Sequence, residues 1–333
     1  MKEFSIGKNE AGQRFDKYLA KLLPKAPKSF LYKMLRKKNI TLNGKKAQGN
    51  ELLANADTVR LFLSDETFAK FSGEEWSAPD DGESDTFASS VIYEDTHILV
   101  VNKEAGVLTQ PESAGGESLA SDLISYLLHS GKITKEELRT FHPSPVNRLD
   151  RNTTGLVLCG KSLKGSQFLS EIIRSREVKK HYLTVTHGEI RDGFYEAFLR
   201  KDPEKNKVSI RKNHADGFSR IVTGVRVLDR NGSYSLCDID LITGKTHQIR
   251  SHLAWLGAPV IGDTKYGDRE LARILRKEIG LTYQFLHAER ITFPECCGDF
   301  SCLSKRTICA PLSLGQRRLL ESLGLSAPDT GIS

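Results

Sequence analysis

Charge is divided unevenly along this chain of 333 residues, and that division limits how the chain can fold. Residues 1–50 hold 13 lysines and arginines and three acidic residues, a balance of 13 − 3 = +10. Residues 65–95 hold ten acidic residues against Lys70 alone, a balance of 1 − 10 = −9. A basic block followed by an acidic stretch predicts a nucleic-acid-binding module on a tether. The alternative is a solvated basic face that has no partner.

The length fits two domains of ordinary size, which can bury a core without disulfides. The longest apolar runs fall far short of the roughly 18 residues that a membrane span needs. The first residues contain no apolar signal core, and none of the six cysteines precedes Cys159. We therefore expect a reduced, monomeric protein of the cytoplasm that has no membrane partner.

Two short amphipathic helices are predicted near the N-terminus. Over residues 13–23, apolar side chains recur at i, i+4, i+7 and i+8, and Pro24 ends the pattern. Ser29 can cap the second helix, and a few short strands follow, up to residue 63. The second helix and its end can offer several cations to RNA phosphates. These cations are Lys28, Lys33, Arg36, Lys37 and Lys38.

The basic segment resembles the small ribosomal-protein S-four-like (alpha-L) RNA-binding domain over residues 12–64. The resemblance implies binding to structured RNA, without specifying a reaction. Residues 65–89 are rich in Ser, Gly, Asp and Glu and have little periodicity, so we expect an acidic, flexible linker there. Residues 90–326 are then expected to form a catalytic domain.

A charged loop at residues 145–155 runs directly into an apolar, strand-like segment. Loops held against a rigid strand are where catalytic groups concentrate. The one carboxylate of this loop, Asp150, lies between Arg148 and Arg151, which could keep it ionised and hold phosphate. The residues alone leave a structural ion pair or a local turn as the alternative.

The run Asn-Arg-Leu-Asp-Arg-Asn-Thr-Thr-Gly over residues 147–155 is similar to a known family signature. It matches the His-Arg-Leu-Asp-Arg-x-Thr-Ser-Gly motif of the RluA-type pseudouridine synthases, which isomerise uridine in RNA. The resemblance implies that Asp150 is the catalytic residue, and that Arg148 is associated with the space left by a flipped base. Asn147 stands where the family most often has His, and Thr154 where Ser is usual.

Two further segments resemble the same family in the expected order, so that the resemblance covers residues 90–312. The first, Lys-His-Tyr-Leu-Thr-Val, contains Tyr182, which the resemblance implies packs on the target base. The alternative for Tyr182 is a half-buried strand tyrosine. The second, Thr-Gly-Lys-Thr-His-Gln-Ile-Arg-Ser-His, contains Arg250, which the resemblance implies pairs with Asp150. Candidate RNA-binding residues around this site are Arg148, Arg151, Lys245 and His247.

Other chemistries lack their motifs in this sequence. Residues 244–246 do not form a phosphate loop, because the first glycine of that pattern would fall on Ile239. His247 and His252 are five residues apart, which places them poorly for sharing a metal ion on a helix. The C-terminal spacing Cys-Cys-x4-Cys-x6-Cys favours free thiols over zinc. We therefore expect no metal, no nucleotide and no other cofactor.

The alternating segments, with a clear hairpin over 219–242, predict an α+β catalytic domain with a mostly antiparallel sheet. The resemblance implies the pseudouridine-synthase fold, with a central cleft, acting on uridine in bacterial large-subunit ribosomal RNA. One alternative is a non-catalytic RNA-binding or ribosome-assembly factor on the same fold, which the intact set of Asp150, Tyr182 and Arg250 argues against. Another is a nucleoside hydrolase or ribosyltransferase, which usually shows clustered carboxylates.

Overall fold

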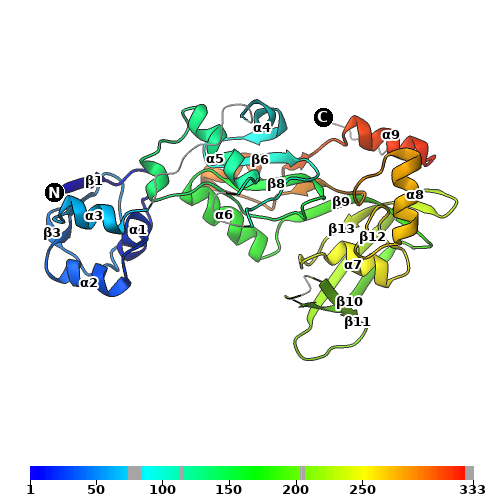
Figure 1. Cartoon of the computed structure of the whole chain (residues 1–333), viewed down its shortest axis with the longest axis horizontal. Coiled ribbons are helices and arrows are strands. Elements are labelled where there is room, and N and C mark those ends of the chain that lie inside the picture. Colours follow the sequence, from blue (N-terminus) through cyan, green and yellow to red (C-terminus); the bar gives the residue numbers. More distant parts are fainter. Residues whose placement is uncertain (74–83, 113–115, 203, 205–206, 327–333) are drawn as a thin grey trace.

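The computed structural model describes residues 1–73, 84–112, 116–202, 204 and 207–326. Two separate sheets organise these residues. A four-stranded sheet near the N-terminus has the order β1-β4-β2-β3, and an eleven-stranded sheet occupies the rest. Figure 1 shows the N-terminal part as a lobe at one end of an elongated molecule.

The N-terminal module packs two helices on its small sheet. Phe15, Leu19, Leu31 and Leu35 are buried, so that the apolar stripes of both helices meet in one core. The second helix begins at Lys28, so Ser29 is not its cap as predicted. The residue at the N-cap position is Pro27, which makes no side-chain hydrogen bond to the helix. The elements are β1 (Lys2–Ser5), α1 (Phe15–Leu22), α2 (Lys28–Arg36), β2 (Ile40–Leu42), β3 (Lys45–Lys46) and β4 (Thr58–Leu61).

The segment expected to be an irregular linker contains helices at both ends, which differs from the prediction. In α3 (Asp65–Phe71), Ser64 caps the first turn and Phe68 is buried in the N-terminal core. In α4 (Ser84–Ser90), Phe87 is buried in the central core. The acidic residues of the first turn favour α3 through the helix dipole. Residues 74–83 lie outside the described part, and the domain boundaries stay a prediction.

The large sheet has the order β11-β10-β12-β13-β9-β14-β8-β6-β5, with β15 beside β14 and β7 beside β8. Only the pair β14 and β8 is parallel among the described strands, so the predicted mostly antiparallel sheet is confirmed. The expected hairpin over 219–242 is present as β12 and β13. The strands are β5 (Val91–Glu94), β6 (Ile98–Lys103), β7 (Ser144–Pro145), β8 (Thr154–Gly160), β9 (Lys179–His187), β10 (Gly193–Asp202), β11 (Lys207–Arg211), β12 (Ser219–Asn231), β13 (Tyr234–Asp240), β14 (Leu286–Thr292) and β15 (Thr307–Cys309).

Helices cover both faces of this sheet, as expected for an α+β domain. On one face, α5 and α7 pack with Tyr182, Ile239 and Ala288. On the other face, α6 covers β6 and β8, while α8 and α9 cover β9 and β13. No helix in the described ranges is long and apolar enough to cross a bilayer. The helices are α5 (Leu119–His129), α6 (Leu163–Arg174), α7 (Gln248–Trp255), α8 (Arg269–Ile279) and α9 (Leu314–Ser322), with short turns η1 (Glu137–Arg139) and η2 (Gly298–Leu303).

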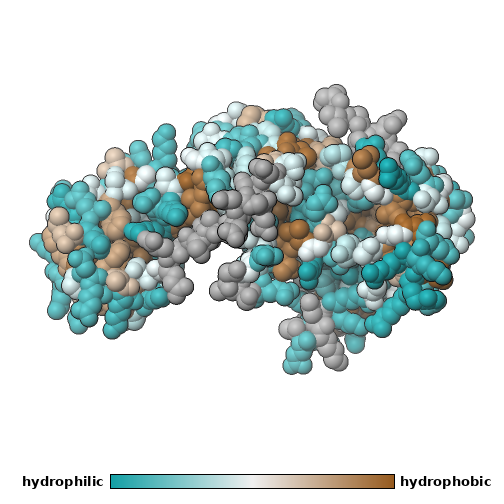
Figure 2. Space-filling view, turned by 45° about the horizontal axis from the view of Figure 1, so that its top comes forward, coloured by the Kyte–Doolittle hydropathy of each residue, from teal (hydrophilic) through white to brown (hydrophobic). Residues whose placement is uncertain are grey.

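The N-terminal lobe contacts the catalytic part at η1. Thr140 Oγ1 donates a hydrogen bond to the buried Glu10 carboxylate over 2.7 Å, and Asn9 Nδ2 donates to Glu137 over 3.2 Å. Figure 2 shows the surface hollowed between this lobe and the lobe at the opposite end. The contact holds the basic module beside the catalytic part.

Candidate active site

Asp150 and Arg250 come together from segments one hundred residues apart. Asp150 lies in the loop that precedes β8, and Arg250 lies in the first turn of α7. Arg250 Nη1 donates to Asp150 Oδ2 over 2.7 Å. The Arg250 side chain is 9% exposed and the Asp150 side chain 27% exposed, so the carboxylate remains accessible while its partner is buried.

Asp263 fixes the guanidinium of Arg250 from the side away from Asp150. Arg250 Nε and Nη2 donate to the two oxygens of Asp263 over 2.7 and 2.9 Å. Asp263 is buried and also accepts the backbone N–H groups of Lys265 and Tyr266. Burial opposes the charged Asp263, but the hydrogen bonds and charge of Arg250 outweigh it and lower the pKa of Asp263. This bidentate pair holds Arg250 in one orientation toward Asp150.

The pKa of Arg250 follows the same balance. Burial lowers it, whereas the hydrogen bonds and charges of Asp263 and Asp150 raise it by more, so that the net shift is upward. None of the three sequence motifs contains Asp263, so its role emerges only from the structure. Gly262, just before it, has φ +72°, and a Cβ there would lie 2.4 Å from the carbonyl oxygen of Tyr283. Only glycine therefore fits this approach.

Tyr182 lies on β9 with its side chain in the core below the site. It is 6% exposed, and its neighbours across the sheet are Ile239 on β13 and Ala288 on β14. Burial raises the pKa of Tyr182, and the charge of Asp150 raises it further. The Tyr182 hydroxyl therefore stays protonated, and the ring lies among apolar side chains near Asp150.

His247 lies at the entrance to α7 with a left-handed φ of +53°. Its Nε2 is 3.9 Å from Asp150 Oδ1, and its Nδ1 is 2.7 Å from the hydroxyl of Tyr266. That hydroxyl accepts the backbone N–H of Val208 over 3.2 Å, so its own proton can go to Nδ1. This arrangement assigns the His247 proton to Nε2, which faces Asp150. Burial lowers the pKa of His247, which favours the neutral ring.

A buried lysine that the sequence analysis did not select supports the loop of Asp150. Lys103, at the end of β6, is 1% exposed and donates to the carbonyl oxygens of Glu104, Val107 and Arg151 over 2.7, 2.9 and 3.0 Å. Burial lowers the pKa of Lys103 to about 8. The sequence feature that could have indicated Lys103 is a lysine at the end of a predicted strand whose other residues are nearly all apolar. Lys103 therefore ties the 104–107 loop to the residue after Asp150.

The two arginines beside Asp150 in sequence are not its partners in space. Arg151 is exposed, and its Nε donates to the carbonyl oxygen of Gly106 over 2.9 Å. Arg148 is also exposed, and no contact between it and Asp150 occurs in the described part of the chain. The two arginines therefore do not converge on Asp150, an arrangement that the sequence had left possible. The chain turns directly after Asp150, whose carbonyl oxygen accepts the N–H of Thr153 over 3.0 Å, and Arg250 supplies the cation instead.

The replacement of the usual histidine by Asn147 has a structural explanation. Asn147 Nδ2 donates to the carbonyl oxygen of Leu156, and its Oδ1 accepts the N–H of Leu158 over 2.7 Å. The amide therefore fastens the loop to β8. Thr154 contacts His287 Nδ1 over 2.7 Å, which ties the start of β8 to β14.

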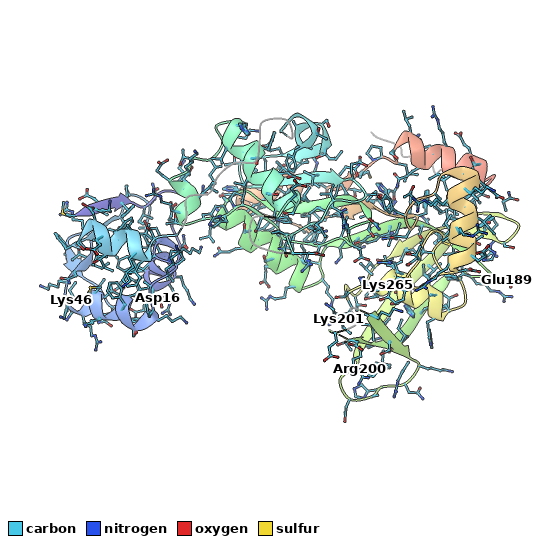
Figure 3. All side chains as sticks on the ribbon, in the orientation of Figure 1. Asp16, Lys46, Glu189, Arg200, Lys201 and Lys265 are labelled. Atoms are coloured by element: carbon cyan, nitrogen blue, oxygen red, sulfur yellow. The ribbon has the colours of Figure 1, made fainter. Side chains whose placement is uncertain are left out.

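The other predicted RNA contacts lie in two places. Lys245 is exposed in the loop before α7. Gln248 Oε1 holds this loop in place by accepting hydrogen bonds from Thr243 Oγ1 and from the backbone N–H of Lys245. The cations of the second helix lie in the N-terminal lobe, and Figure 3 shows Lys46 of that lobe far from Lys265 beside the site. These exposed cations are Lys28, Lys33, Arg36, Lys37 and Lys38.

The described residues contain no group of three side chains arranged to hold a metal ion. The Nδ1 of His252 is 2.9 Å from the hydroxyl of Thr223, which makes this histidine a structural hydrogen-bonding group. All six cysteines are free thiols. The chemistry available at the site is therefore that of one accessible carboxylate, an oriented arginine, a neutral histidine and a buried tyrosine.

Comparison with known proteins agrees with this site. A family model described as RNA pseudouridylate synthase matches residues 97–255. The protein named ribosomal large subunit pseudouridine synthase C from Escherichia coli strain K12 is 30% identical to this chain over an alignment of 340 residues. The alignment covers 97% of each chain. A protein of the same name from Vibrio cholerae is 30% identical over 298 residues, covering 86% of this chain and 87% of the relative.

The fold and the site thus define an RNA-modifying isomerase. The chain belongs to the RNA pseudouridylate synthase family and isomerises uridine to pseudouridine in RNA. Among solved structures, human RNA pseudouridylate synthase domain containing 4 matches with a TM-score of 0.60 and 20% identity. That match covers 74% of this chain and 97% of the human one, and it supports the pseudouridine-synthase fold.

Proposed function

We propose that this enzyme modifies large-subunit ribosomal RNA and that Asp150 is the carboxylate that acts on the ribose of the target uridine. The observation that carries the assignment is the 2.7 Å ion pair between Asp150 and Arg250. Arg250 keeps the carboxylate oriented without covering it, and Asp263 keeps Arg250 from moving. The names of the bacterial relatives support the choice of RNA.

The reaction is an internal rearrangement, so every atom of the nucleotide is retained except one exchanged proton. The bond between ribose C1′ and uracil N1 breaks, and the uracil turns and rejoins C1′ through C5. The proton on C5 is lost, and N1 gains a proton from solvent or a site residue. No water is consumed and no electron is transferred, so the chemistry requires no cofactor.

Tyr182 and His247 have distinct roles in this proposal. The target uracil flips out of the RNA base stack and lies against Tyr182. Stacking on an aromatic ring can hold a flipped base whatever the surrounding RNA sequence. The neutral His247 offers its Nε2 proton 3.9 Å from Asp150 Oδ1. It is therefore available to bond a polar atom of the nucleotide that sits between them.

The N-terminal module supplies affinity in this proposal, as expected for its S-four-like resemblance. Its exposed cations can neutralise phosphates, and the hollow seen in Figure 2 gives the RNA a path between the lobes. Arg148, Arg151 and Lys245 are a second group of exposed cations, in the catalytic part. We further propose that the enzyme acts as a monomer in the cytoplasm, where its free thiols stay reduced.

The target can be tested by mapping pseudouridines in RNA. Large-subunit ribosomal RNA from cells that lack the gene should lose one or a few pseudouridines. Wild-type enzyme should restore them, and Asp150→Asn should not. An unchanged large-subunit map, with a pseudouridine lost from transfer RNA instead, would move the target to another RNA while leaving the isomerase activity in place.

A further inference from the structure

A half-buried lysine faces the same side of the sheet as Tyr182 without a partner of its own. Lys180 precedes Tyr182 by two residues on β9, so both side chains point to one face, about 6.6 Å apart along the strand. The N–H of Leu241 donates to the carbonyl oxygen of Lys180, which places the loop before α7 beside it. Within the described residues, the Lys180 ammonium has no hydrogen bond or ion pair.

The loop that carries Lys245 lies directly against this ammonium. A Cβ built on Gly244 would be 3.6 Å from Lys180 Nζ, so the ammonium is at the backbone of Gly244. Lys245 is the next residue and is exposed. The end of Lys180 is therefore at the loop that leads through His247 to Arg250.

Burial and a like charge both act against the charged form of Lys180. Burial lowers the pKa of Lys180, the charge of Arg176 lowers it further, and only Asp240 opposes them. Arg176 follows α6 in a left-handed conformation and is exposed. Arg176, from the turn after α6, therefore repels Lys180, and Lys245 directly follows the glycine that the Lys180 ammonium approaches. Such a cluster is unfavourable until an anion reaches it.

We propose that Lys180, Lys245 and Arg176 form a subsite for one phosphodiester of the RNA strand, beside the target uridine. All three groups only donate hydrogen bonds, and the cluster carries more positive than negative charge, so the ligand is an anion. The common face with Tyr182 places this anion next to the flipped base. The inference rests on the proposed function for its ligand, and it adds the position at which the substrate strand is held.

Lys179 provides a matched control for Lys180. It is the preceding residue of β9, it is exposed, and its side chain points to the opposite face. Lys180→Met and Lys179→Met therefore change the net charge equally. Both are made in the full-length Asp150→Asn protein, so that binding of an RNA fragment is measured without turnover.

Lys180→Met should raise the Kd about tenfold, as expected for one charged hydrogen bond. It should also reduce the salt dependence of binding by about one counterion, while Lys179→Met changes the Kd less than about twofold. RNA fragments with one neutral methylphosphonate linkage at successive positions then identify the phosphate. At one position next to the target uridine, wild-type and Lys180→Met proteins should bind equally.

Equal effects of the two methionine variants, or an effect of Lys180→Met that persists at every neutral linkage, would overturn the subsite. Lys180→Arg keeps the charge and should restore binding, which separates the subsite from a folding defect. Tritium release by the wild-type enzyme, measured in parallel, tests the proposed function separately. Absence of release would remove the proposed function, while a phosphate-specific effect of Lys180 would still stand.

Discussion

The N-terminal lobe and the central site are both rich in cations, but they hold them in opposite ways. In the lobe, the cations of α2 are exposed, so their side chains can change conformation to contact the phosphates of a flexible RNA. At the site, Arg250 is fixed by Asp263 and Asp150 through three hydrogen bonds and is almost completely buried. The first arrangement suits affinity for a polyanion, and the second suits precise placement of one carboxylate.

The largest effect should come from breaking the buried pair. Arg250→Met removes the guanidinium and leaves Asp263 buried with only two backbone donors. Loss of one partner of a buried ion pair costs about 3–5 kcal/mol, so the free energy of unfolding should fall by that amount. Urea denaturation measures it. A fall of less than about 1 kcal/mol would show that the pair contributes as little as an exposed one.

Tyr182 tests whether the core next to the carboxylate also binds the base. Tyr182→Phe keeps the aromatic face and Tyr182→Ala removes it, and stacking is worth about 1–3 kcal/mol per base. The Phe variant should therefore bind RNA that carries 5-fluorouridine at the target position much more tightly than the Ala variant. Equal binding by both, with a difference only in thermal stability, would make Tyr182 a scaffold residue.

The lowered pKa of Lys103 should make the free energy of unfolding depend on pH. Its pKa is about 8 in the folded protein against 10.5 for an ordinary lysine, so the unfolded chain binds more protons between these values. The wild-type free energy of unfolding should therefore gain roughly 1–3 kcal/mol relative to Lys103→Met as the pH rises from 8 to 10. A constant difference between the two proteins over this range would mean that Lys103 titrates normally.

The exposed cations of α2 should give the smallest effect per residue. Replacing Lys33, Arg36 and Lys37 by Gln should weaken RNA binding by no more than about 1 kcal/mol per charge and reduce its salt dependence. The rate at saturating RNA should not change, because the module lies outside the site. Equal salt dependence for wild-type and triple variant would leave these residues as a solvated face.

The sequence indicated both residues of the ion pair between Asp150 and Arg250, because each lies in a local motif. Asp150 and Arg250 could be selected from their segments, and the segment that carries Tyr182 from its resemblance to the family. The partners that orient them could not. Asp263 reaches Arg250 from another loop, and Lys103 reaches the Asp150 loop from another strand. Such roles depend on long-range packing, which composition and spacing do not encode.

Two predictions from local sequence differ from the structure for the same reason. Sequence adjacency placed Arg151 beside Asp150, but backbone direction turns it toward Gly106. High acidity and low periodicity indicated a linker over 65–89, but Phe68 and Phe87 each anchor a short helix to a different core. In both places, one contact with a distant segment determines the local structure.

Asp150→Asn tests the catalytic assignment most directly. The amide has nearly the same shape and can still accept a hydrogen bond from Arg250, so the variant should fold and bind RNA. The measurement is tritium released to water from RNA labelled at uracil C5. Wild-type enzyme should release tritium without free uracil, and Asp150→Asn should release none. Release at a near-normal rate by a well-folded Asp150→Asn would contradict the assignment and leave Asp150 as the ion-pair partner of Arg250.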